Sequence, residues 1–148
     1  MPQSLAKNLI HLVFSTKNRE PVLIESVRAP LCLYASAVLR DLDSHAITIN
    51  AWHNHVHILF ALSKNYSLAR TVMEVKRATS KWIKTQGKQF AKFHWQDGYG
   101  AFSIGQSGVD EITAYIANQA EHHRVKTFEE EFRSFLKRYQ IEFDERYV

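Results

Sequence analysis

Two histidines separated by one residue are the side chains of this sequence best suited to hold a metal ion. His55 and His57 belong to the largely apolar segment 55–62, which has the composition and length of a β-strand. Side chains of a strand alternate between its two faces, so both imidazoles lie on one face, about 7 Å apart along the strand. Two imidazoles at that distance can reach one metal ion. A strand with one solvent-exposed face would also display polar side chains, and this second reading stays open.

A tyrosine and a glutamine one helical turn apart could add the reactive group. Tyr115 and Gln119 fall in the segment 108–124, which has a helical apolar repeat and begins near Ser107 and Asp110, a pair that resembles a capping box. The Tyr115 hydroxyl could attack a phosphodiester if a metal ion drew charge from the phosphate. From these residues alone, a tyrosine at the polar boundary of an amphipathic helix is the more common explanation.

The charge of the chain is concentrated in one segment. Nineteen Lys and Arg residues against fifteen Asp and Glu residues give a formal net charge of +4. The segment 64–92 contains eight basic residues and one acid, so it carries +7 and the remainder sums to −3. Helical spacing over the predicted helix 67–86 aligns most of these cations opposite its apolar face: Arg70, Arg77, Lys81, Lys84 and, if the helix extends so far, Lys88. This pattern favours a phosphate backbone as partner over an ordinary solvated surface.

Further contacts to nucleic acid are predicted at two other places. Lys17 and Arg19 follow the first predicted strand and could contact phosphates. Trp95 and Tyr99 lie in an aromatic loop that contains glycine, and their rings could stack on bases. In contrast, the acidic residues 129–131 of the tail helix are expected not to contact DNA, and the apolar residues of that helix are expected to pack on the body or on a partner.

The order of the predicted elements indicates the fold. Strands are expected at 9–16, 45–51, 55–62 and around 99–104, and helices at 26–41, 67–86, 108–124 and 127–139. Gly87 is expected to close the second helix in a left-handed conformation, and Thr127 with Glu130 to cap the last one. The first six elements have the order of a ferredoxin-like (RRM-like) split βαβ sandwich of the α+β class. We expect residues 1–148 to form one domain: an antiparallel sheet with helices on one face, an added helix that carries Tyr115, and a tail helix.

Composition excludes several classes of protein. The hydrophobic fraction is 45%, yet no apolar run approaches the ~20 residues needed to cross a bilayer, and no signal-peptide pattern is found. Cys32 is the only cysteine, so an internal disulfide and a thiolate zinc cluster are excluded. We expect a cytoplasmic protein in which Cys32 is a small buried hydrophobe.

Four motifs in order resemble those of one family. The His-Val-His motif at 55–57 and the pair Tyr115 and Gln119 resemble the motifs of the single-tyrosine HUH transposases, the IS-two-hundred-like family of insertion-sequence enzymes. The segments 11–17, 95–103 and 115–123 resemble the opening and later blocks of that family. The likeness extends over most of the chain.

The resemblance implies a site and a reaction. His55, His57 and Gln119 would be metal ligands, and Tyr115 would be the nucleophile. These neutral nitrogen and oxygen ligands suit Mg²⁺ or Mn²⁺, whereas zinc is less favoured without a thiolate or carboxylate. Attack by the Tyr115 oxygen would release a 3′-hydroxyl and leave a 5′-phosphotyrosine, so that single-stranded DNA is cleaved and rejoined at hairpin-marked ends. The resemblance also implies a homodimer in which the tyrosine helix of one subunit completes the site of the other.

Two other functions stay open from the sequence. RRM domains share the predicted element order, so a non-catalytic module that binds single-stranded RNA or DNA is the main alternative. Residues 98–102 match the aromatic RNA-binding motif of such modules only in part. A relaxase or rolling-circle initiator of the same fold is the lesser option, because such enzymes are usually longer or carry more catalytic tyrosines.

Overall fold

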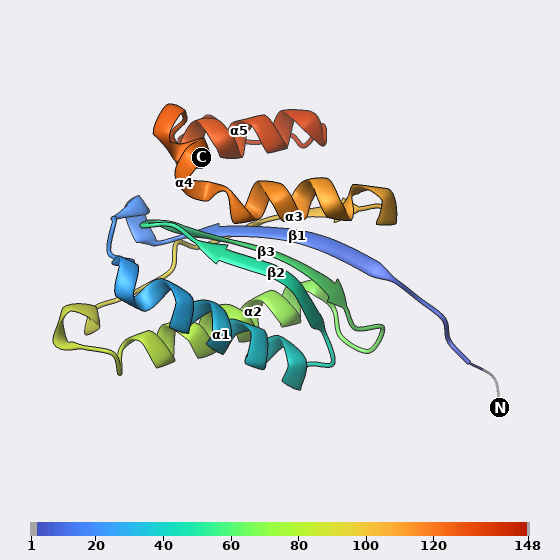
Figure 1. Cartoon of the computed structure of the whole chain (residues 1–148), viewed down its shortest axis with the longest axis horizontal. Coiled ribbons are helices and arrows are strands. Elements are labelled where there is room, and N and C mark those ends of the chain that lie inside the picture. The colour runs from blue at the N-terminus through green and yellow to red at the C-terminus, as the bar shows by residue number, and fades with distance from the viewer. Residues whose placement is uncertain (1–2, 148) are drawn as a thin grey trace.

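An antiparallel sheet of four strands forms the centre of the fold (Figure 1). The computed structural model describes residues 3–147 of the chain. Its strands are β1 (Asn8–Ser15), β2 (His45–Ala51), β3 (His55–Leu62) and β4 (Gly100–Ile104), in the spatial order β2-β3-β1-β4. Each neighbouring pair is antiparallel. This is the strand order of the ferredoxin-like split βαβ sandwich, so the predicted fold class is confirmed.

Two helices cover one face of the sheet (Figure 1). α1 (Glu25–Asp41) and α2 (Leu68–Ile83) bury their apolar sides against one set of alternate strand residues. The shared core contains Leu12 and Phe14 of β1 together with Val56, Ile58 and Phe60 of β3, and Cys32 packs against it. Because strand side chains alternate, the residues between them face away from α1 and α2. His55 and His57 belong to this second set.

The end of α2 differs from the prediction. Its last residue is Ile83, whereas helical spacing predicted continuation to residue 86. The Thr85 backbone nitrogen and the Thr85 hydroxyl both donate to the carbonyl of Trp82. This contact tightens the last turn and competes with continued α-helix. Gly87 is extended, with φ 159° and ψ 160°, so the predicted left-handed cap is wrong. Lys88 therefore lies outside α2.

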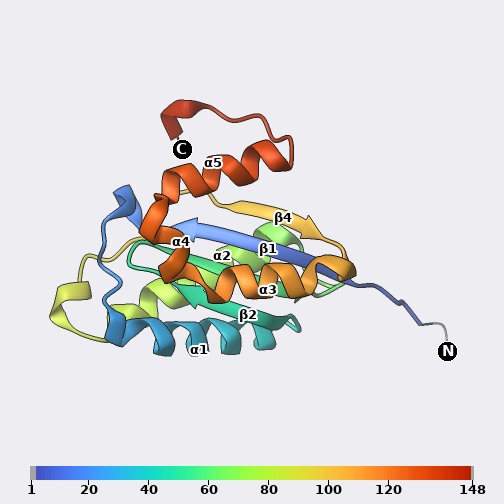
Figure 2. The ribbon, with the colours of Figure 1, turned by 45° about the horizontal axis from the view of Figure 1, so that its top comes forward.

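The later helices cover the opposite face (Figure 1, Figure 2). They are α3 (Val109–Ala117), α4 (Gln119–Val125) and α5 (Phe128–Arg138). α5 begins as predicted, because the Thr127 side chain accepts a hydrogen bond from the Glu130 backbone nitrogen. Its apolar side packs on the body through a buried cluster of Phe128, Phe135 and Leu136 with Val13 and Phe102. Within residues 3–147, no helix is long and apolar enough to cross a membrane.

The helix predicted over 108–124 is interrupted. The chain leaves helical geometry at Asn118, with φ −105° and ψ 38°. The side-chain amide of Asn50, on β2, donates to the carbonyl of Ile116 at 2.9 Å and so occupies an acceptor that a continuing helix would use. The predicted cap from Ser107 is also wrong, because Gly108 takes the N-cap position without a side-chain hydrogen bond. Residues 115 and 119 consequently lie on different helices.

A glycine allows α5 to lie close to the sheet. A Cβ atom added at Gly100, the first residue of β4, would collide with the ring of Phe132 on α5. Glycine in a strand often marks such a close approach. The position of α5 over the sheet thus requires a residue without a side chain at position 100.

Candidate functional site

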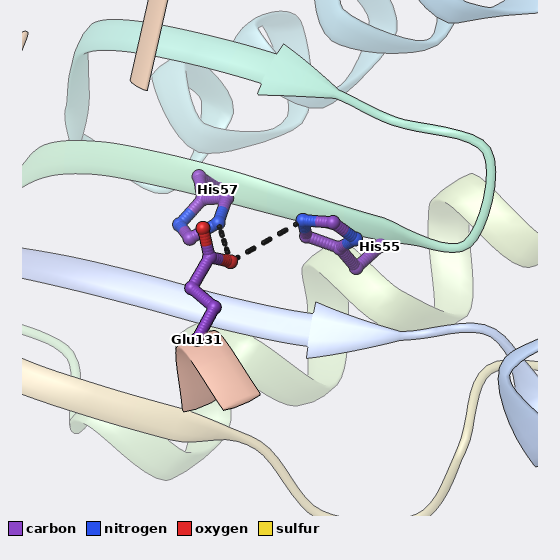
Figure 3. Close-up of side chains that lie close together, drawn as sticks. All are labelled: His55, His57 and Glu131. Atoms are coloured by element: carbon purple, nitrogen blue, oxygen red, sulfur yellow. Dashed lines mark hydrogen bonds and ion pairs between the residues drawn. The ribbon is translucent and has the colours of Figure 1, made fainter. Parts of the chain in front are cut away.

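His55 and His57 point from β3 into the layer between the sheet and the later helices (Figure 3). Both side chains are 0% exposed. The predicted placement of both imidazoles on one face is therefore confirmed. The alternative of a solvent-exposed polar face is excluded, because neither ring reaches the surface.

A carboxylate from α5 lies directly against both imidazoles (Figure 3). Glu131 Oε1 is 2.8 Å from His57 Nε2 and 3.5 Å from His55 Nε2. The three potential ligand atoms lie within 4.8 Å of one another. Glu131 is 1% exposed, so this cluster is a buried candidate metal site.

Glu131 is a site residue that was not predicted, because the acidic residues 129–131 were expected only to stay away from DNA. A signal was available in the spacing. Glu131 is three residues after Phe128 and four before Phe135, and both phenylalanines are buried. Helical geometry places these three residues on one face, so the apolar pattern that predicted packing also predicts burial of this acid.

Gln119 reaches the same cluster from α4. Its Oε1 atom is 3.1 Å from His55 Nε2 and 3.1 Å from His123 Nε2. Its amide nitrogen is buried without a hydrogen-bond partner. An amide that turns its oxygen toward imidazoles and leaves its nitrogen unpaired has the orientation that a cation favours. Gln119 thus lies where the predicted third ligand should lie.

Tyr115 completes the cluster from α3. Its hydroxyl donates a short hydrogen bond to Glu131 Oε2, the carboxylate oxygen that does not contact His57. The Tyr115 ring stacks on His122 with centroids 4.1 Å apart and meets His57 edge-on at 6.0 Å. One chain therefore brings the predicted nucleophile beside the predicted ligands.

The hydrogen bonds of His55 determine which of its nitrogens carries a proton. Burial is the largest influence on this ring and lowers its pKa to about 4, so the ring is neutral near pH 7. Its Nδ1 is 2.8 Å from Asn54 Oδ1. When Nδ1 donates to Asn54, the lone pair is on Nε2, which faces the oxygens of Gln119 and Glu131.

The acids of the cluster are perturbed in opposite directions. Burial would raise the pKa of Glu131, but hydrogen bonds with His123, His55 and His57 outweigh it and lower that pKa. Burial and the hydrogen bond to Glu131 raise the pKa of Tyr115, so the phenol stays protonated at neutral pH. The site thus holds one carboxylate and one protonated phenol in contact.

The donor set fits a divalent cation. Two imidazole nitrogens, an amide oxygen and a carboxylate converge in one buried cluster. A bound cation would take the place of the protons that the imidazoles share with these oxygens. Imidazole and oxygen ligands suit Mn²⁺ and admit Mg²⁺. Two imidazoles and a carboxylate also form zinc sites, and Glu131 supplies the carboxylate whose absence made zinc less favoured.

The predicted DNA-binding cations lie on two sides of the molecule. Arg70, Arg77, Lys81 and Lys84 are exposed along α2 or its end, on the face of the sheet opposite the histidines. Arg77 pairs with Glu74 at 2.7 Å. Lys17 is exposed after β1, and Arg19 pairs with Glu129 of α5 at 3.2 Å. The basic line on α2 is therefore not beside the histidine cluster of its own chain.

Trp95 belongs to the core. It is 8% exposed, and its indole nitrogen donates to the Thr79 hydroxyl at 3.0 Å. Its ring meets Phe14 and Phe93 edge-on. This placement contradicts the expected stacking of Trp95 on bases, because no ring face is available. Tyr99 of the same loop is 41% exposed.

Comparisons with known proteins agree on a family. The profile of the family described as "Transposase IS200 like" matches residues 4–119. A candidate transposase from Deinococcus radiodurans R1 has a similar structure, with a TM-score of 0.63 and 19% identity over 80% of this chain and 98% of its own. A REP-associated tyrosine transposase bound to a REP hairpin has a TM-score of 0.61 and 16% identity over 83% of this chain and 73% of its own. No curated protein matches in sequence.

The family match and the structural likeness differ in what they establish. At these identities the two structures show a shared fold. The profile covers most of the chain and includes the two histidines, Tyr115 and Gln119, while α5 and Glu131 lie beyond it. With the sequence motifs, the fold and the profile in agreement, this chain belongs to the family of IS200-like transposases.

Proposed function

We propose that this protein cleaves and rejoins single-stranded DNA, with Tyr115 as the nucleophile and a divalent metal ion beside it. The observation that carries the proposal is a shared contact. The Tyr115 hydroxyl and His57 Nε2 bond to the two oxygens of one buried carboxylate, Glu131. A nucleophile and a candidate metal ligand are thereby held on the same group.

Four side chains would hold the metal. They are His55 and His57 through Nε2, Glu131 through Oε1 and Gln119 through Oε1. When bound, a divalent ion would draw charge from the scissile phosphate and make its phosphorus easier to attack.

Tyr115 would carry the covalent step. A bond forms between its oxygen and phosphorus while the bond from phosphorus to the 3′ oxygen breaks, which gives a 5′-phosphotyrosine and a 3′-hydroxyl. The hydroxyl already donates to Glu131 Oε2. Because the pKa of Glu131 is lowered and that of Tyr115 is raised, the phenolic proton passes to that carboxylate only as the Tyr115 oxygen bonds to phosphorus. The departing 3′ oxygen takes up the proton that Tyr115 released, by transfer from Glu131, so the number of protons is unchanged. The reverse reaction joins a new 3′-hydroxyl and frees Tyr115.

DNA would reach this site only after a movement of α5. His55, His57 and Glu131 are at most 1% exposed. A phosphodiester cannot contact them while Phe128 and Phe135 cover the cluster. We therefore assign the structure to a closed state of the enzyme.

The basic line of α2 would bind DNA on the other side of the sheet. Its exposed cations Arg70, Arg77, Lys81 and Lys84, with Lys17 nearer the end of β1, suit a phosphate backbone. The single-stranded flank of a DNA hairpin bound there has two routes to an active site. It can pass around an edge of the sheet to the site of the same chain, or it can reach the site of a second subunit. The second route agrees with the homodimer that the sequence resemblance implies.

The alternative of an RRM-like binding module finds no support in the geometry. Such modules expose aromatic residues on the sheet for stacking with bases. Here Phe102 is 2% exposed, because the rings of Phe135 and Tyr139 cover it. The sheet face is used for internal packing and for the histidine cluster.

Cleavage of labelled DNA tests the proposed function. Single-stranded DNA from the flanks of the gene is incubated with the protein in Mn²⁺, in Mg²⁺ and in excess EDTA. We expect strand cleavage with a metal ion, none with EDTA, and none from His57→Ala in any buffer. Cleavage that persists in EDTA would contradict the role of the metal.

A mixing experiment tests whether subunits share their sites. Tyr115→Phe and His57→Ala are inactive separately under the proposal. The resemblance implies sites shared between subunits, but each chain holds Tyr115 beside its own histidines, so we expect their mixture to stay inactive. Recovery of cleavage in the mixture would show instead that the tyrosine helix acts in the partner's site.

A further inference from the structure

A third histidine lies behind the candidate metal ligands. His11, on β1, is fully buried, and its Nε2 is 2.8 Å from His57 Nδ1. The two rings are stacked with centroids 5.1 Å apart, and the ring of Phe135 fixes His11 from its edge at 5.0 Å. His11 touches neither Glu131 nor Gln119 through a hydrogen bond. His11 therefore acts on the candidate metal site through its hydrogen bond with His57.

The contact between the two rings admits one proton. If His11 donates from Nε2, then His57 receives at Nδ1 and carries its own proton on Nε2, where it can donate to Glu131 Oε1 at 2.8 Å. If His57 donates from Nδ1, its Nε2 has a free lone pair. A metal ion can bind Nε2 only in the second arrangement, because a ligating nitrogen must be unprotonated.

We infer that His11 is a positioning residue of the metal site, which accepts the Nδ1 proton of His57 and so holds its Nε2 as a ligand. This inference rests on the proposed metal at His57. Metal-binding histidines usually donate their second ring nitrogen to a carboxylate, a carbonyl or water. Here the acceptor is a neutral imidazole. The pair exchanges between its two arrangements without a change in its total number of protons, since His11 carries a proton on Nε2 in one and on Nδ1 in the other.

The local geometry offers His57 no other partner for this role. Nδ1 of His57 faces His11 on β1. The β1 residue paired directly with His57 is Val13, whose side chain is apolar. Asn54 fulfils the corresponding role for His55 through its Oδ1 atom. Both candidate imidazole ligands are thus oriented by a neutral side-chain acceptor.

Metal affinity tests the inference directly. Binding of Mn²⁺ to the full chain is measured by calorimetry for the wild type, His11→Phe and His11→Gln. Phenylalanine keeps the ring but removes the acceptor, so we expect affinity to fall about 10- to 100-fold. The terminal amide of glutamine can place an acceptor near the original Nε2, so we expect most of the affinity to return. Phe102→Leu, which alters packing against His11 without a bond to His57, should bind Mn²⁺ like the wild type.

Each outcome separates the inference from the proposed function. A wild type that binds no Mn²⁺ would overturn the proposed metal site itself. Two results would overturn only the role of His11, provided that the wild type binds Mn²⁺. One is an affinity of His11→Phe equal to that of the wild type, and the other is an affinity of His11→Gln as low as that of His11→Phe. Nitrogen-detected NMR of the Zn²⁺-loaded wild type gives a second readout that folding alone does not change. We expect His11 to carry its proton on Nδ1 and to accept at Nε2, and a proton on His11 Nε2 would contradict the inference.

Discussion

Glu131 and Tyr115 share a hydrogen bond although sixteen residues separate them in the chain. The bond joins α5 to α3 across the layer that contains His55 and His57. Through its other oxygen, Glu131 also contacts His57. The tail helix is thereby part of the site rather than only a cover for the sheet.

Replacement of Glu131 by glutamine should weaken metal binding. The amide keeps the size of the side chain but removes the charge and one lone-pair oxygen. We expect the affinity for Mn²⁺ in calorimetry to fall by at least about one to two orders of magnitude, which is the loss typical of groups that only support the ligands. Glu130→Gln is the matched control, because Glu130 is the next residue and is exposed. Equal affinity of both variants would remove Glu131 from the metal site.

Stability of the metal-free protein should fall as the pH is lowered from 6.5 to 4. Burial, the largest cause in both cases, lowers the pKa of His55 to about 4 and that of His11 to about 3, against about 6.5 when unfolded. In this window the unfolded chain binds more protons than the folded one, so protonation favours unfolding. The lowered pKa of Glu131 acts in the same direction.

Urea unfolding in EDTA at pH 7.5, 5.5 and 4.5 measures this effect. We expect the free energy of unfolding to decrease by an amount on the order of 3 kcal/mol per buried histidine over the whole window. A free energy that is constant or increases toward pH 4.5 would show that these rings are not buried and neutral in the folded protein.

Replacement of Gly100 by alanine should loosen α5. The new Cβ would collide with the ring of Phe132, which α5 places against β4. Overpacking of this kind costs roughly 1–3 kcal/mol, and we expect that loss in urea unfolding, together with faster proteolysis of the tail helix. Gly105→Ala is the control, since its added Cβ would come no closer than 4.0 Å to the Ser107 hydroxyl. Identical stability of the two variants would argue against tight packing of α5.

Much of the site could be predicted because its first part is local. Alternation along 55–62 placed both histidines on one face, and burial of that face confirms the placement. The motif pair Tyr115 and Gln119 lies at the cluster as the family resemblance implied. The first prediction depends on the two-residue periodicity of a strand. The second depends on the family resemblance, because residues 115 and 119 lie on different helices.

The remaining features depend on contacts between distant segments. The break after α3 comes from Asn50, 66 residues before Ile116, and no local propensity at Asn118 demands it. Trp95 is of a residue type that often stacks on bases. It is buried here because its indole nitrogen donates to Thr79 and its ring packs against Phe14. Glu131 becomes a site residue only when α5 folds back over the sheet. The helix break, the burial of Trp95 and the placement of Glu131 are therefore set by long-range packing, which the local sequence pattern does not contain.

The identity of the DNA-linked residue tests the central claim most directly. The protein is incubated in Mn²⁺ with single-stranded DNA from the flanks of its gene, denatured and digested, and the covalent peptide–DNA adduct is identified by mass spectrometry, with Tyr115→Phe treated in parallel. We predict one adduct, a phosphotyrosine at Tyr115 with the 5′ end of the cleaved strand, and none in the variant. An adduct at another residue, or one formed equally by Tyr115→Phe, would contradict the assignment of Tyr115 as the nucleophile.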